Sequence, residues 1–328
     1  MNDESVKEGR KSARSWGKAV SRFVVACSLI PVLLFAFTFL ARQFYLAELM
    51  VNFRAQLMLM LLPFPILLGL LKQWRWCLTL GVVCLFAVYG VGYVYFPADQ
   101  PSAGPTKLKI MSFNVLGHNF DQYAVADRVR EHNPDVLTVV EYSNHWEEVF
   151  KEFYEEYPYR VLEPRWHGFG IAMFSKFPII DSEVRMLTEK STDNPCIVAK
   201  LQVEDQELRV AGMHVLSPTN VFRMKLRNAQ IKEMAQILNQ RQEPTVLVGD
   251  FNCVPWSPVL VDFLKSTELR DSRQGFGYQP SWHVKLWPMM IPIDHAFVSE
   301  QVHVHDRMLG DAAGSDHLPL VLEISITE

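Results

Sequence analysis

Thr245-Val246-Leu247-Val248-Gly249-Asp250-Phe251-Asn252 is the stretch that decides the fold. Its aliphatic, β-branched run favours a buried strand, which ends at a glycine followed by a carboxylate and an amide two positions apart. Side chains alternate along a strand, so Asp250 and Asn252 point to the same side if the chain stays extended. An acid beside an amide suits a hard cation, a water molecule or a phosphoryl oxygen. The stretch therefore predicts one wall of a site at the end of a buried strand.

Composition divides the 328 residues into two parts. Residues 1–96 are dominated by apolar runs and hold 10 of the 32 Lys and Arg residues and 4 of the 36 Asp and Glu residues. Residues 97–328 read as a soluble α/β mixture with 22 basic against 32 acidic side chains and all ten histidines. An acidic domain repels polyanions unless a metal ion or a local basic patch intervenes, so tight non-specific nucleic-acid binding is disfavoured.

The five cysteines follow no CxxC or zinc-type spacing. Cys27, Cys77 and Cys84 lie in the apolar part, where they are interpreted as small hydrophobic residues. Cys196 and Cys253 would pair only if the fold brings them together. The cysteine pattern therefore indicates no zinc site.

Three apolar runs follow a polar, basic arm at residues 1–22. Uncharged runs of about twenty residues are long enough to cross a bilayer, and buried core helices of that length are rarer. We expect a membrane region at residues 23–96 with three transmembrane helices, at about 23–41, 55–71 and 77–96. The second run is shorter and contains two prolines, so a re-entrant segment is the alternative.

Basic residues beside the spans predict the orientation. The arm and the second short loop hold eight Lys and Arg residues, against two in the first loop. The arm is therefore expected to be cytoplasmic, in the cell (inner) membrane, and residue 97 onward to be periplasmic or external. If the second run is re-entrant, the domain after it faces the cytoplasm.

Residues 97–106 are rich in Pro, Ala and Gly and are expected to form an extended linker before a catalytic domain at 107–328. The periodicities in that domain predict many short strands with few helices between them. Two packed sheets with helices outside fit this order better than a doubly wound sheet. The expected strands are 107–115, 135–141, 170–174, 196–203, 207–215, the stretch 245–252, 293–299 and 318–326. The expected helices are 121–132, 146–157 and 221–241, with a further helix starting at Ser257-Pro258.

Polar residues of metal-binding or proton-transfer type follow strand after strand. A single Glu or His in such a place is usually a solvated turn residue or a satisfied core residue, but six such strand ends in one domain favour a shared site. They are Asn114, Glu141, His214, Asp250 with Asn252, Asp294, and Asp316 with His317.

Six stretches in this order resemble the endonuclease/exonuclease/phosphatase superfamily, whose fold is that of DNase I. They are MSFNV (111–115), VVEYS (139–143), AGMHVLSP (211–218), VGDFNCVPWSP (248–258), IDHAFVS (293–299) and GSDHLPL (314–320). The pairing of GDFN with SDHLP is the most specific part of the match. The resemblance implies an α/β (α+β) fold, a four-layer αββα sandwich of two packed mixed β-sheets flanked by helices. The arrangement of PWSP (255–258) after GDFN, and of Pro280-Ser281-Trp282 before IDH, resembles a bacterial membrane-anchored subgroup.

The resemblance also implies a divalent-metal site. Glu141 is expected to be the main ligand, with Asn114 and Asp316 beside it. Oxygen ligands suit Mg²⁺ or Mn²⁺, and no Cys and His set for zinc is present in the sequence.

The remaining motif residues receive catalytic roles from the same resemblance. Asp250 is expected to orient or deprotonate the attacking water, and Asn252 to hold a phosphoryl oxygen. His317 is expected to bond the phosphate with its ring held by Asp294, and His214 to make another phosphate contact. The division between acid and base stays open, because coupled groups share their titration.

Several other polar and aromatic residues are set aside. His295 should face away from Asp294, in the core or at the surface, and Cys253 is interpreted as a packing residue. Arg223 and Arg227 are four residues apart and share a helix face. We expect this face to be solvated, and contact with a phosphate is the alternative. His303 and His305 alternate on a late strand, where a second metal site is the minor alternative. Trp256, Trp282 and Trp287 either line the substrate cleft or fill the core.

The sequence thus predicts a membrane-anchored, divalent-metal-dependent phosphoesterase that hydrolyses a phosphodiester by in-line attack of water. A nuclease-like activity is the first reading. A hydrolase of phospholipids, phosphoinositides or small phosphate esters is the alternative, since no basic run with interleaved aromatics marks a nucleic-acid groove. A catalytically silent, membrane-tethered binding module is the second alternative. Nothing in the sequence indicates a protein partner.

Overall fold

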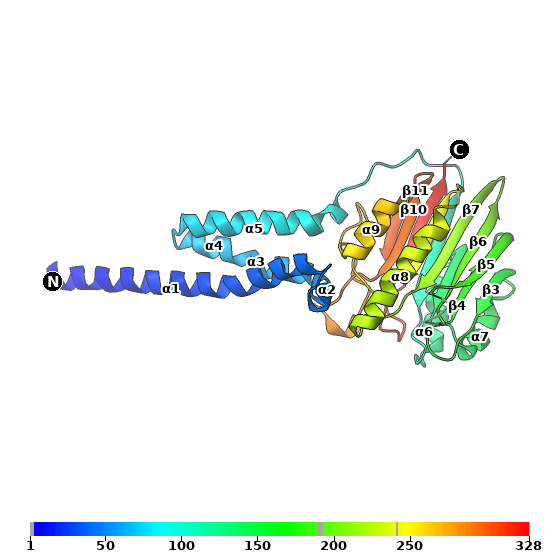
Figure 1. The fold of residues 1–328 in the computed structure, drawn as a ribbon, viewed down its shortest axis with the longest axis horizontal. Coiled ribbons are helices and arrows are strands. Elements are labelled where there is room, and N and C mark those ends of the chain that lie inside the picture. Colours follow the sequence, from blue (N-terminus) through cyan, green and yellow to red (C-terminus); the bar gives the residue numbers. More distant parts are fainter. Residues whose placement is uncertain (1–2, 189–192, 241, 328) are drawn as a thin grey trace. The chain divides into compact units, whose positions relative to one another are not determined.

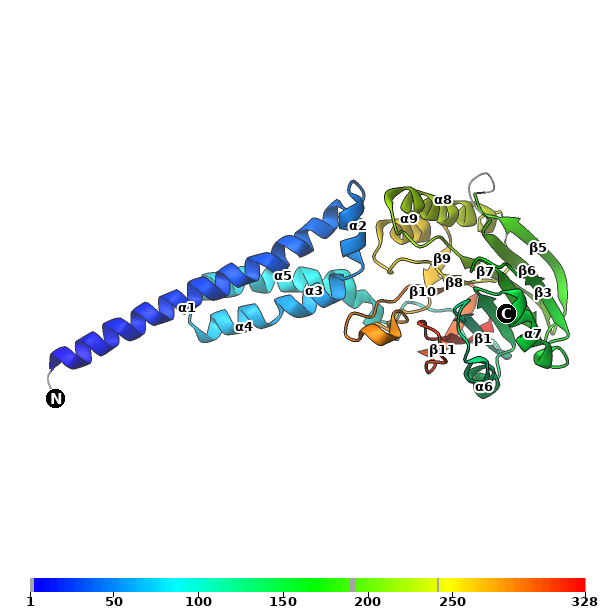
Figure 2. The same ribbon diagram turned by 90° about the horizontal axis from the view of Figure 1, so that it is seen from below.

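The computed structural model describes residues 3–188, 193–240 and 242–327, with side chains from residue 16 onward. Contacts divide the chain into two compact units, residues 1–93 and 94–328. Figures 1 and 2 show a helical N-terminal unit and a second unit built on strands. Each unit is described by itself.

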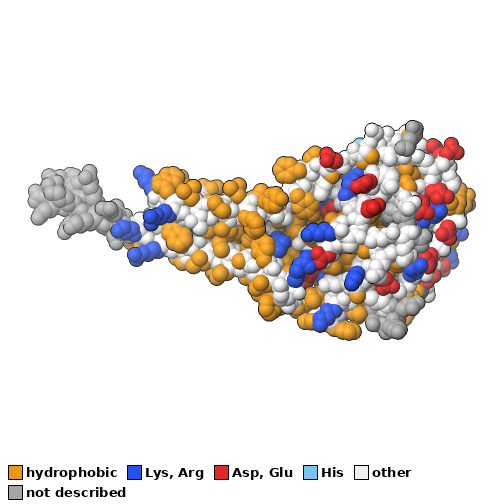
Figure 3. Space-filling model, turned by 45° about the horizontal axis from the view of Figure 1, so that its top comes forward, with side chains coloured by type: hydrophobic (Ala, Val, Ile, Leu, Met, Phe, Trp, Pro, Cys, Tyr) orange, Lys and Arg blue, Asp and Glu red, His pale blue; other side chains and the backbone are white. Residues whose placement is uncertain are grey.

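Two helices of the N-terminal unit are long and apolar enough to cross a membrane. The candidate spans are Trp16–Leu40, with 25 residues, and Trp74–Tyr95, with 22 residues. Figure 3 shows hydrophobic side chains over much of the visible surface of this unit, as expected of lipid-facing helices. Its elements are α1 (Asp3–Phe37), η1 (Thr38–Leu40), α2 (Tyr45–Val51), α3 (Arg54–Leu61), α4 (Pro63–Leu70) and α5 (Trp74–Gly92).

The second expected span is broken. Tyr45–Val51 and Arg54–Leu70 together pass the same test of length and composition but are bent by 68°. Arg54 lies at the break, where its guanidinium donates to the hydroxyl and the carbonyl of Thr38 at 2.8 and 3.1 Å. The structure therefore offers two spans, or three if the bent pair is one, and the prediction of three stays a prediction.

The second unit contains two six-stranded sheets, ordered β11-β12-β1-β2-β4-β3 and β5-β6-β7-β8-β10-β9. The pairs β1–β2 and β7–β8 are parallel and the other pairs are antiparallel, so both sheets are mixed. The strands are β1 (Lys107–Asn114), β2 (Val136–Val140), β3 (Tyr159–Glu163), β4 (Ile171–Ser175), β5 (Ile179–Met186), β6 (Pro195–Val203), β7 (Gln206–His214), β8 (Thr245–Asp250), β9 (Leu269–Asp271), β10 (Asp294–Ser299), β11 (Val302–Leu309) and β12 (Leu320–Ile326).

Helices cover the outer face of each sheet, which confirms the predicted four-layer αββα sandwich (Figure 1). Helices α6 (Gln122–His132) and α7 (Asn144–Phe150) pack on the first sheet, and α8 (Val221–Leu238) and α9 (Pro258–Ser266) pack on the second. A third apolar cluster lies between the sheets and takes residues from both.

Strand β8 explains why its sequence is apolar without alternation. Val246 and Val248 belong to the cluster between the sheets, whereas Leu247 belongs to the cluster beneath α8 and α9. Both faces of the strand are therefore buried, as in parallel sheets covered on both sides. Gly249 has φ +145°, and a Cβ there would lie 1.9 Å from the carbonyl oxygen of Met213. Only glycine allows β7 and β8 to pair at this position.

The structure corrects some predicted boundaries. The helix expected at residues 146–157 is shorter, because α7 ends at Phe150 and is followed by the 3-10 turn η3 (Lys151–Phe153). The sequence reading gave no boundaries for strands β3, β5, β9 and β11. Strand β5 is an edge strand with several exposed residues and lacks an apolar alternation. Helix α8 is capped by Asn220, whose side chain accepts from Arg223 N at 2.9 Å.

Residues 94–106, which lead into β1, lie along the second unit. The carbonyl of Val94 accepts from Gly275 N and Gly277 N, both at 2.9 Å. Further on, the Gln100 side chain accepts from Val304 N at 2.8 Å. Residues 97–104 have no regular secondary structure, in keeping with an extended segment, and these contacts hold that segment on the domain.

Candidate active site

Strand register aligns three predicted site residues across the second sheet. Asp250, the last residue of β8, pairs with His214 on β7 and with Asp294 on β10. Each lies an even number of residues from positions of its own strand that pack between the sheets, such as Val248 on β8 and Ala296 on β10. Their side chains therefore continue the core between the sheets up to its rim. All three are buried, with exposed fractions of 5% or less.

The first sheet brings Asn114 and Glu141 to the same rim. Asn114 ends β1 and is 1% exposed, and its Nδ2 donates to Glu141 Oε1 and to Asp250 Oδ2, both at 3.2 Å. Glu141 follows β2 with φ +61°, and its Oε2 accepts from Gly117 N at 2.8 Å. One amide group therefore joins the two sheets through a carboxylate from each.

His317 lies between two buried carboxylates. Its Nδ1 donates to Asp294 Oδ2 at 2.9 Å, and its Nε2 lies 3.6 Å from Asp250 Oδ2. Ser315 fixes the backbone here, because its hydroxyl donates to the Asn114 carbonyl at 2.7 Å and accepts from His317 N at 3.0 Å. The imidazole is thus oriented from both sides before any substrate binds.

This arrangement shifts the pKa of both partners. Burial raises the pKa of Asp250 to about 6, although the nearby His317 opposes the shift. Burial alone would lower the pKa of His317, but the carboxylates of Asp294 and Asp250 outweigh it and raise that pKa to about 10. Near neutral pH the geometry therefore supports an ionised Asp250 beside a protonated His317, two groups that titrate as a coupled pair.

Asn252 and His214 lie on either side of Asp250. Asn252 N donates to Asp250 Oδ1 at 2.8 Å, and its side-chain Nδ2 donates to the Val215 carbonyl at 3.0 Å. His214 Nε2 lies 3.6 Å from Asp250 Oδ2, and its ring contacts Phe169 with centroids 5.2 Å apart. Asp250 Oδ1 is therefore held by the backbone, while Oδ2 faces the histidines and Asn114.

Asp316 is held by a tryptophan. Trp282 Nε1 donates to Asp316 Oδ2 at 2.8 Å, whereas Asp316 Oδ1 is buried without a hydrogen-bond partner among the described residues. All eight residues predicted for the site thus lie at or beside one rim. Trp282, for which cleft and core were both open, supports them, as do Ser281 and Ser315, for which no role was predicted. Ser281 does so through its hydroxyl, which accepts from Asp294 N at 3.1 Å.

The sequence match now decides the family. The profile of the Endonuclease/Exonuclease/phosphatase family matches residues 111–317, which include the whole rim. This chain belongs to that family. Members of the endonuclease/exonuclease/phosphatase family are phosphoesterase hydrolases that generally use divalent metals, so membership supports hydrolase activity here. No curated protein matches the sequence.

Solved structures show the same fold. D. rerio TDP2 complexed with single strand DNA product is 16% identical, with a TM-score of 0.59, 67% of this chain covered and 100% of that chain. The human nocturnin catalytic domain with bound sulfate anion is 20% identical, with a TM-score of 0.57 and coverages of 67% and 94%. The endonuclease/exonuclease/phosphatase from Beutenbergia cavernae DSM 12333 is 17% identical, with a TM-score of 0.57 and coverages of 68% and 72%. Identities this low support the fold alone.

The rim of this family member fits a divalent cation in two ways. Glu141, Asn114 and Asp316 offer oxygen donors, and Asp316 Oδ1 is buried without a hydrogen-bond partner among the described residues. Asp250, Asp294 and His317 form a second group, with ligand atoms within 4.8 Å of one another. In that group His317 Nδ1 is already bonded to Asp294, so a cation there would have to displace this bond. The all-oxygen set suits Mg²⁺ better.

Arg227 differs from its prediction. Instead of lying on a solvated face it is 1% exposed, and its Nη1 donates to the Asn252 carbonyl at 3.1 Å. Arg223, one turn earlier, donates to the Ser217 carbonyl at 3.0 Å. Arg227 therefore positions the GDFN segment from behind, a role that helical spacing alone does not reveal.

Other residues that were set aside lie outside the rim. His295 is fully buried, with Nε2 2.8 Å from the Cys253 carbonyl, and Cys196 and Cys253 are free thiols in the core. His303 and His305 have ring centroids 4.6 Å apart, and each contacts a polar group away from the rim. Trp256 is buried and stacks on Tyr278, whereas Trp287 is 81% exposed.

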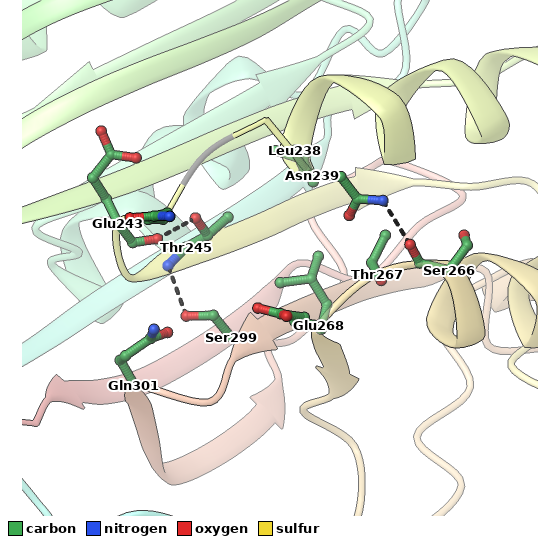
Figure 4. A pocket seen from close by; sticks show the side chains of 11 residues that line it. Leu238, Asn239, Glu243, Thr245, Ser266, Thr267, Glu268, Ser299 and Gln301 are labelled. Carbon is green, nitrogen blue, oxygen red and sulfur yellow. Dashed lines mark hydrogen bonds between the residues drawn. The ribbon is translucent and has the colours of Figure 1, made fainter.

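A polar cleft of about 320 Å³ lies at the opposite end of β8 (Figure 4). It is lined by Thr245, the first residue of that strand, and by Ser299, whose hydroxyl accepts from Thr245 N at 2.9 Å. Asp250 ends the same strand five residues later, about 17 Å away at the rise of an extended chain. The cleft contains none of the rim residues and is not the active site.

Proposed function

We propose that this protein is a membrane-anchored, divalent-metal-dependent phosphoesterase that hydrolyses a phosphodiester by in-line attack of water. The observation that carries the proposal is the convergence of Glu141, Asn114, Asp250 and the His317–Asp294 pair at one buried rim. These groups come from the two sheets. A reaction at a point between the sheets would use every one of these groups.

Asp250 is the proposed base. Its Oδ1 is held by Asn252 N, so Oδ2 is the atom that orients water and takes its proton. The protonated His317, held by Asp294, places positive charge against the phosphoryl oxygens. Asn252 and His214, on either side of Asp250, are the proposed further contacts to those oxygens.

Glu141, Asn114 and Asp316 are the proposed ligands of Mg²⁺ or Mn²⁺. A bound cation supplies Lewis-acid polarisation of the phosphoryl group and offsets the charge on the leaving oxygen. Trp282 orients Asp316 for this task through its indole N–H. Gly117 N does the same for Glu141.

We further propose that the protein is an integral, multi-pass protein of the cell (inner) membrane with its catalytic unit on the periplasmic or external side. The support is the length of the two candidate spans and the excess of basic residues in the arm and second loop.

Two substrate classes fit the rim, nucleic acids and lipid or small phosphate esters. The acidic balance of residues 97–328 favours the second class, because that charge repels a polyanion. A catalytically silent binding module is the weaker candidate. Binding alone does not require a base, an Asp-paired histidine and a set of oxygen ligands in one place.

Hydrolysis by the purified full-length protein tests the proposal. In detergent or nanodiscs with MgCl₂, bis(p-nitrophenyl) phosphate should be hydrolysed, and EDTA should stop the reaction. DNA, RNA, phospholipids and phosphoinositides are assayed in parallel. A protein that binds Mg²⁺ in calorimetry but cleaves no phosphoester would instead be a binding module.

A further inference from the structure

An apolar loop runs from the 3-10 turn η4 (Val284–Leu286), which it includes, to β10 (drawn in orange in Figure 2). Its tip presents Leu286, Trp287 and Met289 to solvent, with exposed fractions of 52%, 81% and 47%. Lys285 is also exposed. Large apolar side chains clustered in this way on a soluble surface mark a site of interaction.

The base of this loop is firmly held. Trp282 N donates to the Ile291 carbonyl at 3.0 Å, and the Tyr278 hydroxyl donates to the Met290 carbonyl at 3.0 Å. The two ends of the loop are thereby closed against each other. Its apolar tip therefore projects from a fixed support, and its exposure is a property of the fold.

The loop also adjoins the catalytic rim. Val284 N donates to the Asp316 carbonyl at 3.1 Å, and Trp282 donates to the Asp316 side chain. Leu318 N donates to the Ser281 carbonyl at 2.9 Å. A surface that binds the loop therefore lies next to the residues proposed to bind the metal and the phosphate.

The start of the catalytic unit reaches the same region. Val94 and Tyr95 are the last residues of a candidate span, and Val94 accepts from Gly275 N and Gly277 N. Tyr278, which bonds the loop base, directly follows Gly277. The first residue of this unit is therefore bonded beside the support of the loop.

We propose that residues 285–289 insert into the headgroup region of the bilayer and that the active site acts on phosphoesters of membrane lipids. Trp with Leu and Met beside a Lys is the composition of an interfacial anchor, since the ring and aliphatic groups enter the boundary layer and the cation meets lipid phosphates. The substrate half of this inference rests on the proposed function, whereas the docking half rests on the loop alone.

Tryptophan quenching tests the docking. Full-length protein is placed in nanodiscs of phosphatidylcholine and phosphatidylglycerol, with or without brominated acyl chains. The contribution of Trp287 to the fluorescence is the difference between wild type and Trp287→Ser, and the bromolipid should quench it. The contribution of Trp166, obtained in the same way from Trp166→Ser, should not be quenched, although Trp166 has an exposed fraction of 90%. Equal quenching of the two contributions, or none for Trp287, overturns the docking.

Turnover tests the substrate class. Phosphatidylglycerol in the same disc is followed by mass spectrometry, and bis(p-nitrophenyl) phosphate is followed in solution. The double variant Leu286→Ser/Trp287→Ser should lower lipid turnover at least tenfold more than turnover of the soluble ester. An unchanged ratio, or cleavage of nucleic acid but not lipid, overturns the substrate assignment. If the wild-type protein cleaves neither ester, the proposed function fails, while quenching still decides the docking.

Discussion

His317 Nδ1 lies 2.9 Å from Asp294 Oδ2, and the two side chains are 5% and 4% exposed. The two residues come from different parts of the chain, and the same imidazole faces Asp250 Oδ2 at 3.6 Å on its other side. The Asp294 carboxylate keeps the imidazole protonated against the opposing effect of burial, and it fixes the orientation of the ring. The catalytic proposal depends on this relationship.

His317→Ala should abolish most of the Mg²⁺-dependent hydrolysis, with a fall in turnover of about 10²- to 10⁴-fold for the loss of a positioned acid–base group. Steady-state kinetics on bis(p-nitrophenyl) phosphate measures it. His145→Ala changes an exposed histidine whose ring nitrogen contacts the Gln122 side chain on α6, and it serves as the matched control. Because alanine leaves Asp294 without its partner, His317→Gln is measured too, and both are checked by thermal unfolding. A folded variant with wild-type turnover would refute the mechanism.

The pH profile should have two limbs. Asp250 works as a base only without its proton, so activity should rise as pH increases through about 6. His317 works as a cation only with its proton, so activity should fall as pH increases through about 10. The values measured at fixed Mg²⁺ belong to the coupled pair. A rate that stays constant between about pH 4.5 and 7.5, the range around the acid limb, would exclude Asp250 as the base.

Glu141→Gln should weaken metal binding. The change keeps the shape of the side chain and removes its charge, so the dissociation constant for Mg²⁺ or Mn²⁺ should rise about tenfold or more, a loss of about 1.4 kcal/mol. Titration calorimetry on the full-length protein measures this constant. Glu155→Gln, on an exposed stretch after α7, is the control with the same change of charge. Equal affinities of the two variants would remove Glu141 from the metal site.

Arg273→Met should destabilise the catalytic unit. The Arg273 guanidinium is fully buried, bonds the Asp271 carboxylate at 3.4 Å and donates to the Asp294 carbonyl at 2.9 Å. Its removal leaves Asp271 buried without this partner, a loss of about 3 kcal/mol or more. For a unit of this size that corresponds to a fall in Tm of about 6 °C or more. Thermal unfolding measures it, with the exposed Arg130→Met expected within about 1 °C of wild type.

A reporter enzyme that is active only after export should work when fused after Glu328. Fused after Gln73, in the second short loop, the same reporter should stay inactive, because that loop is proposed to be cytoplasmic. Activity assays on intact cells compare the two fusions. The opposite pattern would mean that the bent segment Tyr45–Leu70 does not cross the membrane.

The sequence by itself determined which residues share a face. Parity along β8 and β10 separates Asp250 and Asp294 from His295, and the structure places His295 in the core beneath the outer helices. The family motifs likewise predicted the fold, which the structure and the family match confirm, and they marked residues that the structure brings to one rim. These features depend on local periodicity and residue type, which can be read from the sequence without any tertiary contact.

Only the tertiary structure decided how the two sheets meet at the rim. That Asn114 joins Glu141 to Asp250 depends on the packing of one sheet on the other, which strand periodicity does not specify. The burial of Arg227 beneath Asn252 and the bond from Trp282 to Asp316 are likewise contacts between distant segments. In VLVGDFN, alternation placed Asp250 on one side of its strand. The opposing sheet and the neighbouring strands gave that carboxylate its histidines, its amide partner and its raised pKa.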